Sequence, residues 1–227
     1  FGHIGCFSFH PRKAITTGEG GMVVTADPEI SSRIASLRDH GATISNIERH
    51  EKKMSYFLPD YDIVGYNFRM TDFQGALGVA QMEKAEMLLK SRRNLAVRYD
   101  SALKEVPWLI TPFVPENQVS GYQSYVCLFS GNEDIGRMTI NNIDSLHQKR
   151  NKFMSYLEEL GIATRQGTHA VHTLGYYRKK YRLHPEHCLK AFIADRLSIS
   201  LPLYHGLTGE EFQYIIEAIK SYSRRGE

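Results

Sequence analysis

Cysteine, tryptophan and long apolar runs are scarce in this sequence. Of its 227 residues three are cysteine, Cys6, Cys127 and Cys188, and one is tryptophan. An odd number of scattered cysteines argues against a disulfide framework and favours a reducing compartment, so we expect a cytoplasmic protein. No apolar run approaches the roughly 20 residues that a helix needs to cross a membrane, and we expect no membrane partner.

An excess of charge of one sign is also missing. Lysine and arginine number 28 and aspartate and glutamate 25, so the formal net charge is only +3. Such a balance argues against nucleic acid as a partner. Hydrophobic residues make up 42% of the chain, which is enough to bury a core and excludes general disorder. The length fits one large domain or two small ones.

Residues 6–25 predict a strand, a glycine-containing turn and a second strand. Phe7 and Phe9 alternate with polar residues, which is the period of a half-buried strand. Pro11 ends the pairing because it has no N–H to donate. The turn contains three glycines, which allow backbone angles that other residues avoid: Gly18, Gly20 and Gly21.

One lysine, Lys13, lies between these two strands. If the loop holds it against apolar surface, its amine favours the neutral, nucleophilic form, which can form a Schiff base with a carbonyl compound or with pyridoxal phosphate (PLP). Ser8 offers a hydroxyl to a phosphate. The alternative is a surface loop with a solvated lysine, which is where most lysines are found.

The order Ser-Phe-x-x-x-Lys-x-Ile-Thr-Thr-Gly-Glu-Gly-Gly over residues 8–21 resembles the cofactor-lysine segment of the DegT/StrS-type sugar aminotransferase family. These are PLP-dependent enzymes of the aspartate-aminotransferase fold, fold type I. The resemblance implies that Lys13 carries PLP and that Ser8 contacts the cofactor phosphate. Some relatives have histidine instead of the lysine and act as dehydratases, so the lysine favours transamination.

Residues 65–81 hold a second informative stretch. Thr71 and Gln74 have the spacing of a capping box and predict a helix whose small residues would let another backbone approach, as in tight packing or a dimer. Before it, Asn67 could cap a turn and Arg69 could pair with a carboxylate. The stretch also resembles the family's second signature, which implies that Asn67 reaches the cofactor phosphate of the neighbouring subunit and gives Arg69 a structural or substrate-lining role.

The remaining residues up to about 106 are predicted to form helices and a loop. Asp27 and Pro28 predict the start of a helix that ends near Gly41, and residues 42–64 predict a long loop. The helix from Asp72 is expected to continue to about Val106, with its arginines solvated.

The second part alternates strands and helices, which predicts an α/β layer. Strands are expected at 122–129, 162–165 and 197–201, and helices at 143–160, at 188–196 and after the capping box Thr208–Glu211. We therefore expect two domains. Residues 1–111 would end the large PLP-binding domain with its cofactor lysine and its dimer or linker helix, and residues 112–227 would form the small C-terminal α/β domain.

One cluster of possible zinc ligands consists of the histidines at 169, 172, 184 and 187 together with Cys188. Their spacing fits it poorly, and we interpret them as half-exposed loop residues with no metal. By resemblance to the family, His172 and Tyr177 are substrate candidates. Arg165 and Arg178 could contact a diphosphate, because a guanidinium suits bidentate phosphate contacts, and solvent exposure is the alternative.

The resemblance runs from residue 1 to about 219 and implies that the chain is the C-terminal half of such an enzyme, inactive by itself. It implies transamination of a nucleotide-linked keto sugar to an amino sugar for a surface polysaccharide or an antibiotic. L-glutamate would be the amino donor, and a homodimer would share its active sites. Two alternatives stay open: a PLP-dependent sugar dehydratase, and a non-catalytic regulatory or binding relative of the same fold.

Overall fold

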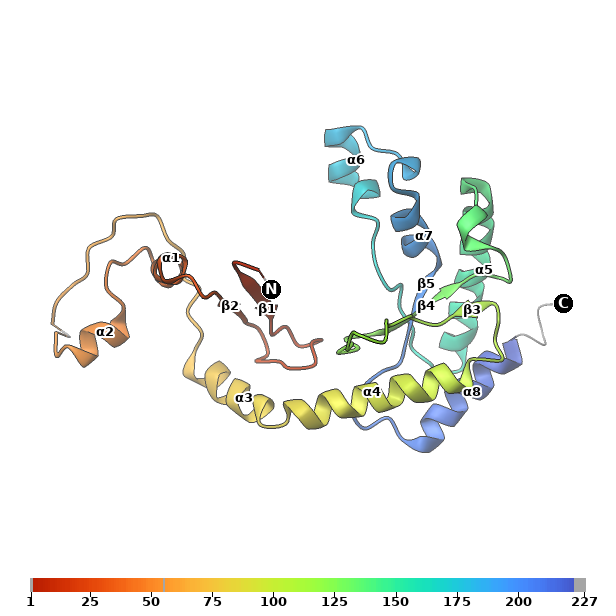
Figure 1. The fold of residues 1–227 in the computed structure, drawn as a ribbon, viewed down its shortest axis with the longest axis horizontal. Helices are drawn as coiled ribbons and strands as arrows, with labels where there is room; N and C mark the ends of the chain where they lie inside the picture. Colours follow the sequence, from red (N-terminus) through yellow and green to blue (C-terminus); the bar gives the residue numbers. More distant parts are fainter. Residues whose placement is uncertain (1, 55, 223–227) are drawn as a thin grey trace. The chain divides into compact units, whose positions relative to one another are not determined.

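The computed structural model describes residues 2–54 and 56–222 (Figure 1). The chain divides into two compact units, a first unit Phe1–Glu86 and a second unit Met87–Glu227. Our prediction from the sequence placed the domain boundary later, between residues 111 and 112. The difference arises because the helix α4 (Ala85–Ala102) buries Leu95, Ala96 and Tyr99 in the core of the second unit. The assignment of the first part to a large cofactor-binding domain stays a prediction.

The first unit contains the expected antiparallel pair of strands. Strand β1 (Gly5–Ser8) pairs with β2 (Gly21–Val24) so that Cys6 lies opposite Val23 and Ser8 opposite Gly21. The strand–turn–strand prediction is confirmed, but the half-buried strand is not seen. Phe7 is 57% exposed, because nothing within the described residues covers that face.

Helix α1 (Pro28–Arg38) begins as predicted. The Asp27 carboxylate accepts hydrogen bonds from the backbone N–H of Glu29, at 2.8 Å, and of Ile30, at 3.2 Å. The chain then turns at Gly41, whose φ is +85° and where a Cβ would lie 1.8 Å from the carbonyl oxygen of Ile63.

The segment 42–64 is not a plain loop, because it contains the short helix α2 (Asn46–Glu51). Ser45 caps this helix through a hydrogen bond from the Glu48 N–H at 3.1 Å. Helix α3 (Asp72–Met82) has the predicted capping box, in which Thr71 and Gln74 satisfy each other's backbone N–H groups. The continuous helix that we predicted up to Val106 is broken at Glu83–Lys84, and α4 ends at Ala102.

Of the α4 arginines that we predicted to be solvated, Arg93 and Arg98 are exposed, whereas Arg92 is partly buried. One terminal nitrogen of Arg92 donates to the carbonyl oxygens of Tyr122, Gln123 and Leu203 at 3.1–3.3 Å, and burial lowers the pKa of Arg92. Arg93 donates to a backbone carbonyl as well, and Arg98 lies 4.0 Å above the ring of Phe212. These side chains therefore hold the segment 120–123 and helix α8 (Gly209–Tyr222) against α4.

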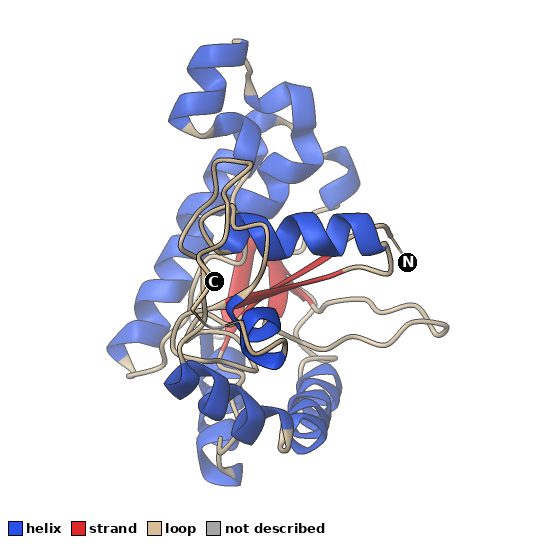
Figure 2. Cartoon of the chain, turned by 90° about the vertical axis from the view of Figure 1, so that its left-hand side faces the viewer, coloured by secondary structure: helices blue, strands red, loops and turns tan. Residues whose placement is uncertain are grey.

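The second unit is built on a three-stranded antiparallel sheet in the order β3 (Leu109–Ile110), β4 (Tyr125–Phe129) and β5 (Ser198–Leu201). Its other helices are α5 (Ile140–Glu159), α6 (Gly175–Tyr181), α7 (Leu189–Leu197) and α8 (Gly209–Tyr222). Short 3-10 turns occupy Ile135–Arg137, Val171–Thr173 and Pro185–Cys188. The strand predicted at 162–165 is reduced to one bridge between Arg165 and Ser200. The mixed α/β class is confirmed, with helices forming most of the regular structure (Figure 2).

The hydrophobic core lies in the second unit. Alternate residues of β4, namely Tyr125, Cys127 and Phe129, are buried, and α8 buries a stripe that runs from Phe212 to Ile219. Among the described residues, Ala42 is the only buried apolar residue of the first unit. Within residues 2–54 and 56–222, no helix is both long and apolar enough to cross a membrane.

Candidate active site

Main-chain hydrogen bonds hold the loop that carries Lys13. The Lys13 N–H donates to the carbonyl oxygen of His10 at 2.9 Å, which closes a turn. Beyond the strands, Phe9 pairs with both sides of the loop: its N–H donates to Gly20 and its oxygen accepts from Thr17, at 2.9 and 3.1 Å. The backbone of Lys13 is therefore fixed. Its side chain is exposed, so the apolar surroundings that we expected are not present among the described residues.

Two glycines of the loop, Gly20 and Gly21, are required by close packing. Gly20 has φ +152°, and a Cβ there would lie 2.5 Å from the hydroxyl oxygen of buried Thr17. A Cβ at Gly21 would lie 2.9 Å from the carbonyl oxygen of Phe7. Thr17 itself donates to the Glu19 carbonyl at 2.8 Å. Larger residues at these glycines would push the two strands and the lysine loop apart.

The helix of the second signature contacts this loop. The side-chain amide of Gln74 donates to the carbonyl oxygen of Glu19 at 2.9 Å, across 55 residues of sequence. At Gly78, a Cβ would lie 3.2 Å from the methyl group of Thr17. The small residues that we noted in this helix thus allow a close approach to the lysine loop. The two signatures, separate in sequence, form one structure.

Ser8 ends β1 just before the lysine loop, and its side chain is exposed. Its hydroxyl oxygen accepts a long hydrogen bond, 3.4 Å, from the N–H of His10. The hydroxyl hydrogen is then available to another acceptor. The imidazole of His10 accepts from the Arg12 N–H at 3.1 Å and lies 3.7 Å from the Glu19 carboxylate.

The two predicted residues before α3 differ in their partners. Asn67 pairs through its backbone with Asp39, and its side chain is exposed. Arg69 forms an ion pair with the mostly buried carboxylate of Asp39 at 2.9 Å. This is the structural alternative that the sequence suggested for Arg69, while its role toward a substrate stays a prediction.

A hollow of about 1060 Å³ brings the two signatures together in the first unit. Gly20 and Gly21 line it from the lysine loop, and Asn67, Arg69 and Gln74 line it from the second signature. Apolar side chains of β1, β2 and α1 complete the lining. Lys13 and Ser8 do not line this hollow.

The remaining predicted substrate residues belong to the second unit. Arg165 is exposed, and its backbone pairs with Ser200. His172 was interpreted as half-exposed, but it is buried, with Nε2 3.4 Å from the carbonyl oxygen of Pro185. Tyr177 is 39% exposed on α6, with its ring edge-on to Tyr176, and Arg178 is exposed on the same helix.

The paired histidines interact with each other. The rings of His184 and His187 stack at 5.7 Å, and the backbone N–H of His184 donates to Nδ1 of His187 at 2.8 Å. Across the described ranges, no three potential ligands among histidine, cysteine, aspartate and glutamate come together.

A buried polar network was missed in the sequence. Arg150 is only 2% exposed and lies on the buried stripe of α5, between Leu146 and Phe153. It connects to Gln166 and, through it, to Asp195. An arginine at a core-facing position of an amphipathic helix was the available signal.

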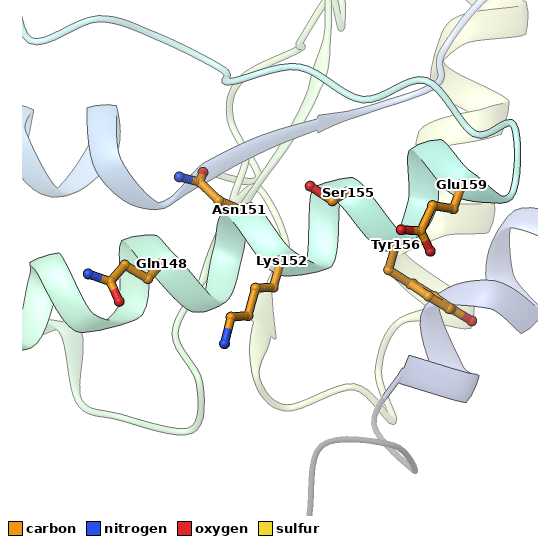
Figure 3. Close-up of a pocket in the computed structure, with 6 residues that line it drawn as sticks. All are labelled: Gln148, Asn151, Lys152, Ser155, Tyr156 and Glu159. Carbon is orange, nitrogen blue, oxygen red and sulfur yellow. The ribbon is translucent and has the colours of Figure 1, made fainter.

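A separate hollow of about 580 Å³ runs along α5 (Figure 3). Its six lining residues all come from this one helix, between Gln148 and Glu159, and most are polar. It contains none of the predicted site residues, and we assign it no function.

Comparisons with known proteins agree with these features. The model of the DegT/DnrJ/EryC1/StrS aminotransferase family matches residues 1–220. An uncharacterized protein, MJ1066, of Methanocaldococcus jannaschii is 32% identical over 216 residues, which cover 94% of this chain and 52% of that protein. The GDP-perosamine synthase of Escherichia coli O157:H7 is 30% identical over 98% of this chain and 52% of its own length. The chain thus spans about half the length of the curated relatives that it matches.

Solved structures give the same result. The putative sugar aminotransferase Spr1654 of Streptococcus pneumoniae, in its PMP form, is similar with a TM-score of 0.82 and 26% identity, over 98% of this chain and 53% of that one. The Helicobacter pylori aminotransferase PseC, involved in pseudaminic acid biosynthesis, is similar with a TM-score of 0.79 and 26% identity over 97% of this chain and 53% of that one. With both signatures joined in one unit, a family match over nearly the whole chain and these structural neighbours, the chain belongs to the DegT/DnrJ/EryC1/StrS aminotransferase family.

Proposed function

We propose that the protein containing this chain is a PLP-dependent sugar aminotransferase in which Lys13 binds the cofactor covalently. The observation that carries the proposal is the hydrogen bond from Gln74 to Glu19, because it joins the second signature to the loop that holds Lys13. The donor set fits the cofactor: a primary amine on a backbone-fixed loop, an exposed hydroxyl at Ser8 and an exposed amide at Asn67. Structural neighbours solved in PLP and PMP forms support it.

PLP, when bound, supplies the electron sink that transamination needs. The chain's own contribution is centred on Lys13, whose Nζ would hold the cofactor covalently. With an amino donor bound, the free amine of Lys13 would act as a base that takes the proton from the donor Cα and then as the acid that returns this proton later in the same half-reaction. Ser8 donates its hydroxyl hydrogen to the cofactor phosphate. In a homodimer with shared sites, Asn67 would serve the phosphate of the neighbouring subunit.

The substrate that we propose is a nucleotide-linked keto sugar, with L-glutamate as the amino donor. Relatives whose names carry GDP- or UDP-linked sugars support the substrate class. Arg165 and Arg178 are exposed guanidinium groups that suit a diphosphate, and Tyr177 offers a ring face. Arg69 and His172 are weaker candidates, because one is held by Asp39 and the other is buried.

The first test is the absorbance spectrum of the complete protein after incubation with PLP. We expect a visible band that shifts when L-glutamate is added, and reduction with borohydride should fix the cofactor to the peptide that contains Lys13. Lys13→Ala should lose the band and the fixed label, because no other amine is held in that loop. The matched control is Lys84→Ala, an exposed lysine in the break between α3 and α4, which should keep both.

The proposal fails if Lys13→Ala keeps the band, or if the folded wild-type protein shows none. If the band shifts with glutamate, keto-sugar nucleotides should be tested as acceptors by following the 2-oxo acid that is released. If the absorbance band shifts with glutamate but no keto-sugar nucleotide is aminated, the cofactor role of Lys13 stands and only the proposed substrate class is removed.

A further inference from the structure

The guanidinium group of Arg150 is buried without direct contact to a carboxylate among the partners that the structure gives it. Its terminal nitrogens contact the Met154 sulfur at 3.2 Å, the Ser198 carbonyl at 3.4 Å, His147 Nδ1 at 2.9 Å and the Gln166 side-chain oxygen at 3.4 Å. Burying a cation without compensation is costly. Burial lowers the pKa of Arg150, and the charge of Asp195 opposes that effect.

Gln166 links this cation to an anion. Its side-chain oxygen accepts from Arg150, and its amide nitrogen donates to one carboxylate oxygen of Asp195. The same nitrogen donates to the carbonyl oxygen of Thr168 at 2.8 Å. The other oxygen of Asp195 accepts from the Ala170 N–H at 3.0 Å. A neutral amide thus connects the two charges, and Gln166 and Asp195 also bind the loop 166–170, at the Thr168 carbonyl and the Ala170 N–H.

This loop is also held against the sheet. The Gly167 N–H donates to the Ser198 hydroxyl at 3.0 Å, and a Cβ on Gly167 would lie 2.4 Å from a methyl group of Val126. Just before it, the backbone of Arg165 pairs in both directions with Ser200, at 2.7 and 3.3 Å. The main chain around Arg165 is therefore fixed while its guanidinium is exposed.

We propose that Gln166 is a positioning residue, which uses Arg150 and Asp195 to fix the segment 165–170 so that Arg165 is presented to an anionic group of the substrate. The diphosphate of a nucleotide-linked sugar has the matching chemistry, since guanidinium binds phosphate oxygens bidentately. The role of Arg165 toward the substrate rests on the proposed function, whereas the hydrogen-bonded bridge formed by Gln166 does not depend on it.

The first experiment compares Gln166→Leu with the control Gln148→Leu, an exposed glutamine on α5. In the complete protein, Gln166→Leu should speed amide hydrogen exchange in the segment 165–170 by about tenfold, because the amide that compensates both charges is lost. The KM for the nucleotide sugar should rise by about tenfold. The KM for glutamate and the cofactor absorbance should stay unchanged, as should every measurement on the control.

The second experiment tests the bridge by exchanging its charges. Gln166→Glu alone places two carboxylates in contact, and Asp195→Asn alone removes the anion, so each should loosen the segment. The combined variant Q166E/D195N restores the path from Arg150 to Ala170: the new carboxylate at 166 accepts from Arg150, and the new amide at 195 donates to it while accepting from the Ala170 N–H. The bond from residue 166 to the Thr168 carbonyl is not restored, because a carboxylate has no hydrogen to donate. We therefore expect hydrogen exchange in 165–170 to be slower in the combined variant than in either single variant, without returning fully to the wild-type rate.

The proposal is overturned if Gln166→Leu leaves exchange in 165–170 unchanged, or if the combined variant is no better than the worse single variant. If Gln166→Leu does not fold, as judged by circular dichroism, the comparison of the charge-exchange variants decides. If the wild-type protein transaminates no nucleotide sugar, the role of Arg165 fails with the proposed function, and the exchange rates still decide whether Gln166 forms the bridge.

Discussion

At the scale of single residues, side chains of the same charge differ in their surroundings and partners. Lys13 is exposed on a backbone-fixed loop, whereas Arg150 is buried on a helix and Arg69 is paired with Asp39. The cysteines differ in the same way: Cys6 and Cys188 are exposed, and Cys127 is buried in β4. Burial raises the pKa of the Cys127 thiol, with a smaller contribution from the charge of Asp100.

We predict from this that Cys127 is unreactive in the folded protein. In the double variant Cys6→Ser/Cys188→Ser, a thiol reagent such as DTNB should label Cys127 only after unfolding, since the neutral thiol is a poor nucleophile and is not accessible.

A group whose pKa is raised by folding stabilises the protein below its unfolded pKa, and that contribution is lost as the pH rises. Stability should therefore fall above about pH 9, where an unfolded thiol ionises.

Two measurements check this: the rate of labelling without denaturant, and the denaturation midpoint between pH 7 and 10. Rapid labelling of Cys127 in the folded double variant would contradict the prediction. The single variant Cys127→Ala should show a weaker loss of stability at alkaline pH than the double variant. Burial also raises the pKa of Tyr99 and of Tyr125, so part of the loss should remain.

At the scale of secondary structure, side-chain caps determine where several elements begin. Thr71 begins α3, Thr139 begins α5 and Thr208 begins α8, each by accepting a hydrogen bond from an N–H three residues later. A second hydrogen bond completes this cap: the backbone N–H of Thr208 donates to the Glu211 carboxylate at 2.8 Å. Helix α8 packs its apolar stripe from Phe212 onward into the core, so the position of its first turn affects the packing of the second unit.

We therefore predict that Thr208→Ala destabilises the second unit by about 1 kcal/mol, because two N–H groups lose their side-chain partner or its orientation. For a domain of this size, this corresponds to a fall in Tm of about 2–4 °C. Thr208→Ser keeps the hydroxyl and should be close to the wild type. Equal losses for alanine and serine would show that the methyl group, and not the cap, is responsible.

At the scale of the whole chain, the two units differ in how much core they have. The second unit holds almost all of the buried apolar residues that the structure describes, and in the first unit large side chains are exposed, including Phe73 at 91% and Phe68 at 70%. Exposed apolar surface of this extent marks sites of association with other polypeptide. In the first unit such exposed apolar side chains lie on β1, β2 and α3, at Phe7, Met22 and Phe73 among others.

We predict that residues 87–222, produced alone, unfold cooperatively in urea, because they contain a complete core. Residues 2–86 alone should bind the dye ANS and show no cooperative transition. The measurements are circular dichroism during a urea titration and dye fluorescence for each fragment. A sharp transition for residues 2–86 would show that the first unit is stable without further polypeptide, contrary to this prediction.

Features that depend only on neighbouring residues could be predicted from the sequence. The caps at Asp27, Thr71 and Thr208 act over two or three residues, and each helix begins where its cap predicts. The two signatures are contiguous strings, and they were sufficient to indicate the family and to select Lys13, Ser8 and Asn67 as site residues, whose roles remain predictions.

Contacts between residues that are distant in sequence became visible only in the folded chain. Arg69 meets Asp39 across 30 residues, and Gln166 meets Asp195 across 29. Arg150 is buried because α5 turns that face toward the core, and no local pattern shows which polar groups then meet it. The hydrogen bond between Gln74 and Glu19, which joins the two signatures, has the same origin: the chain must fold before the two residues are near each other.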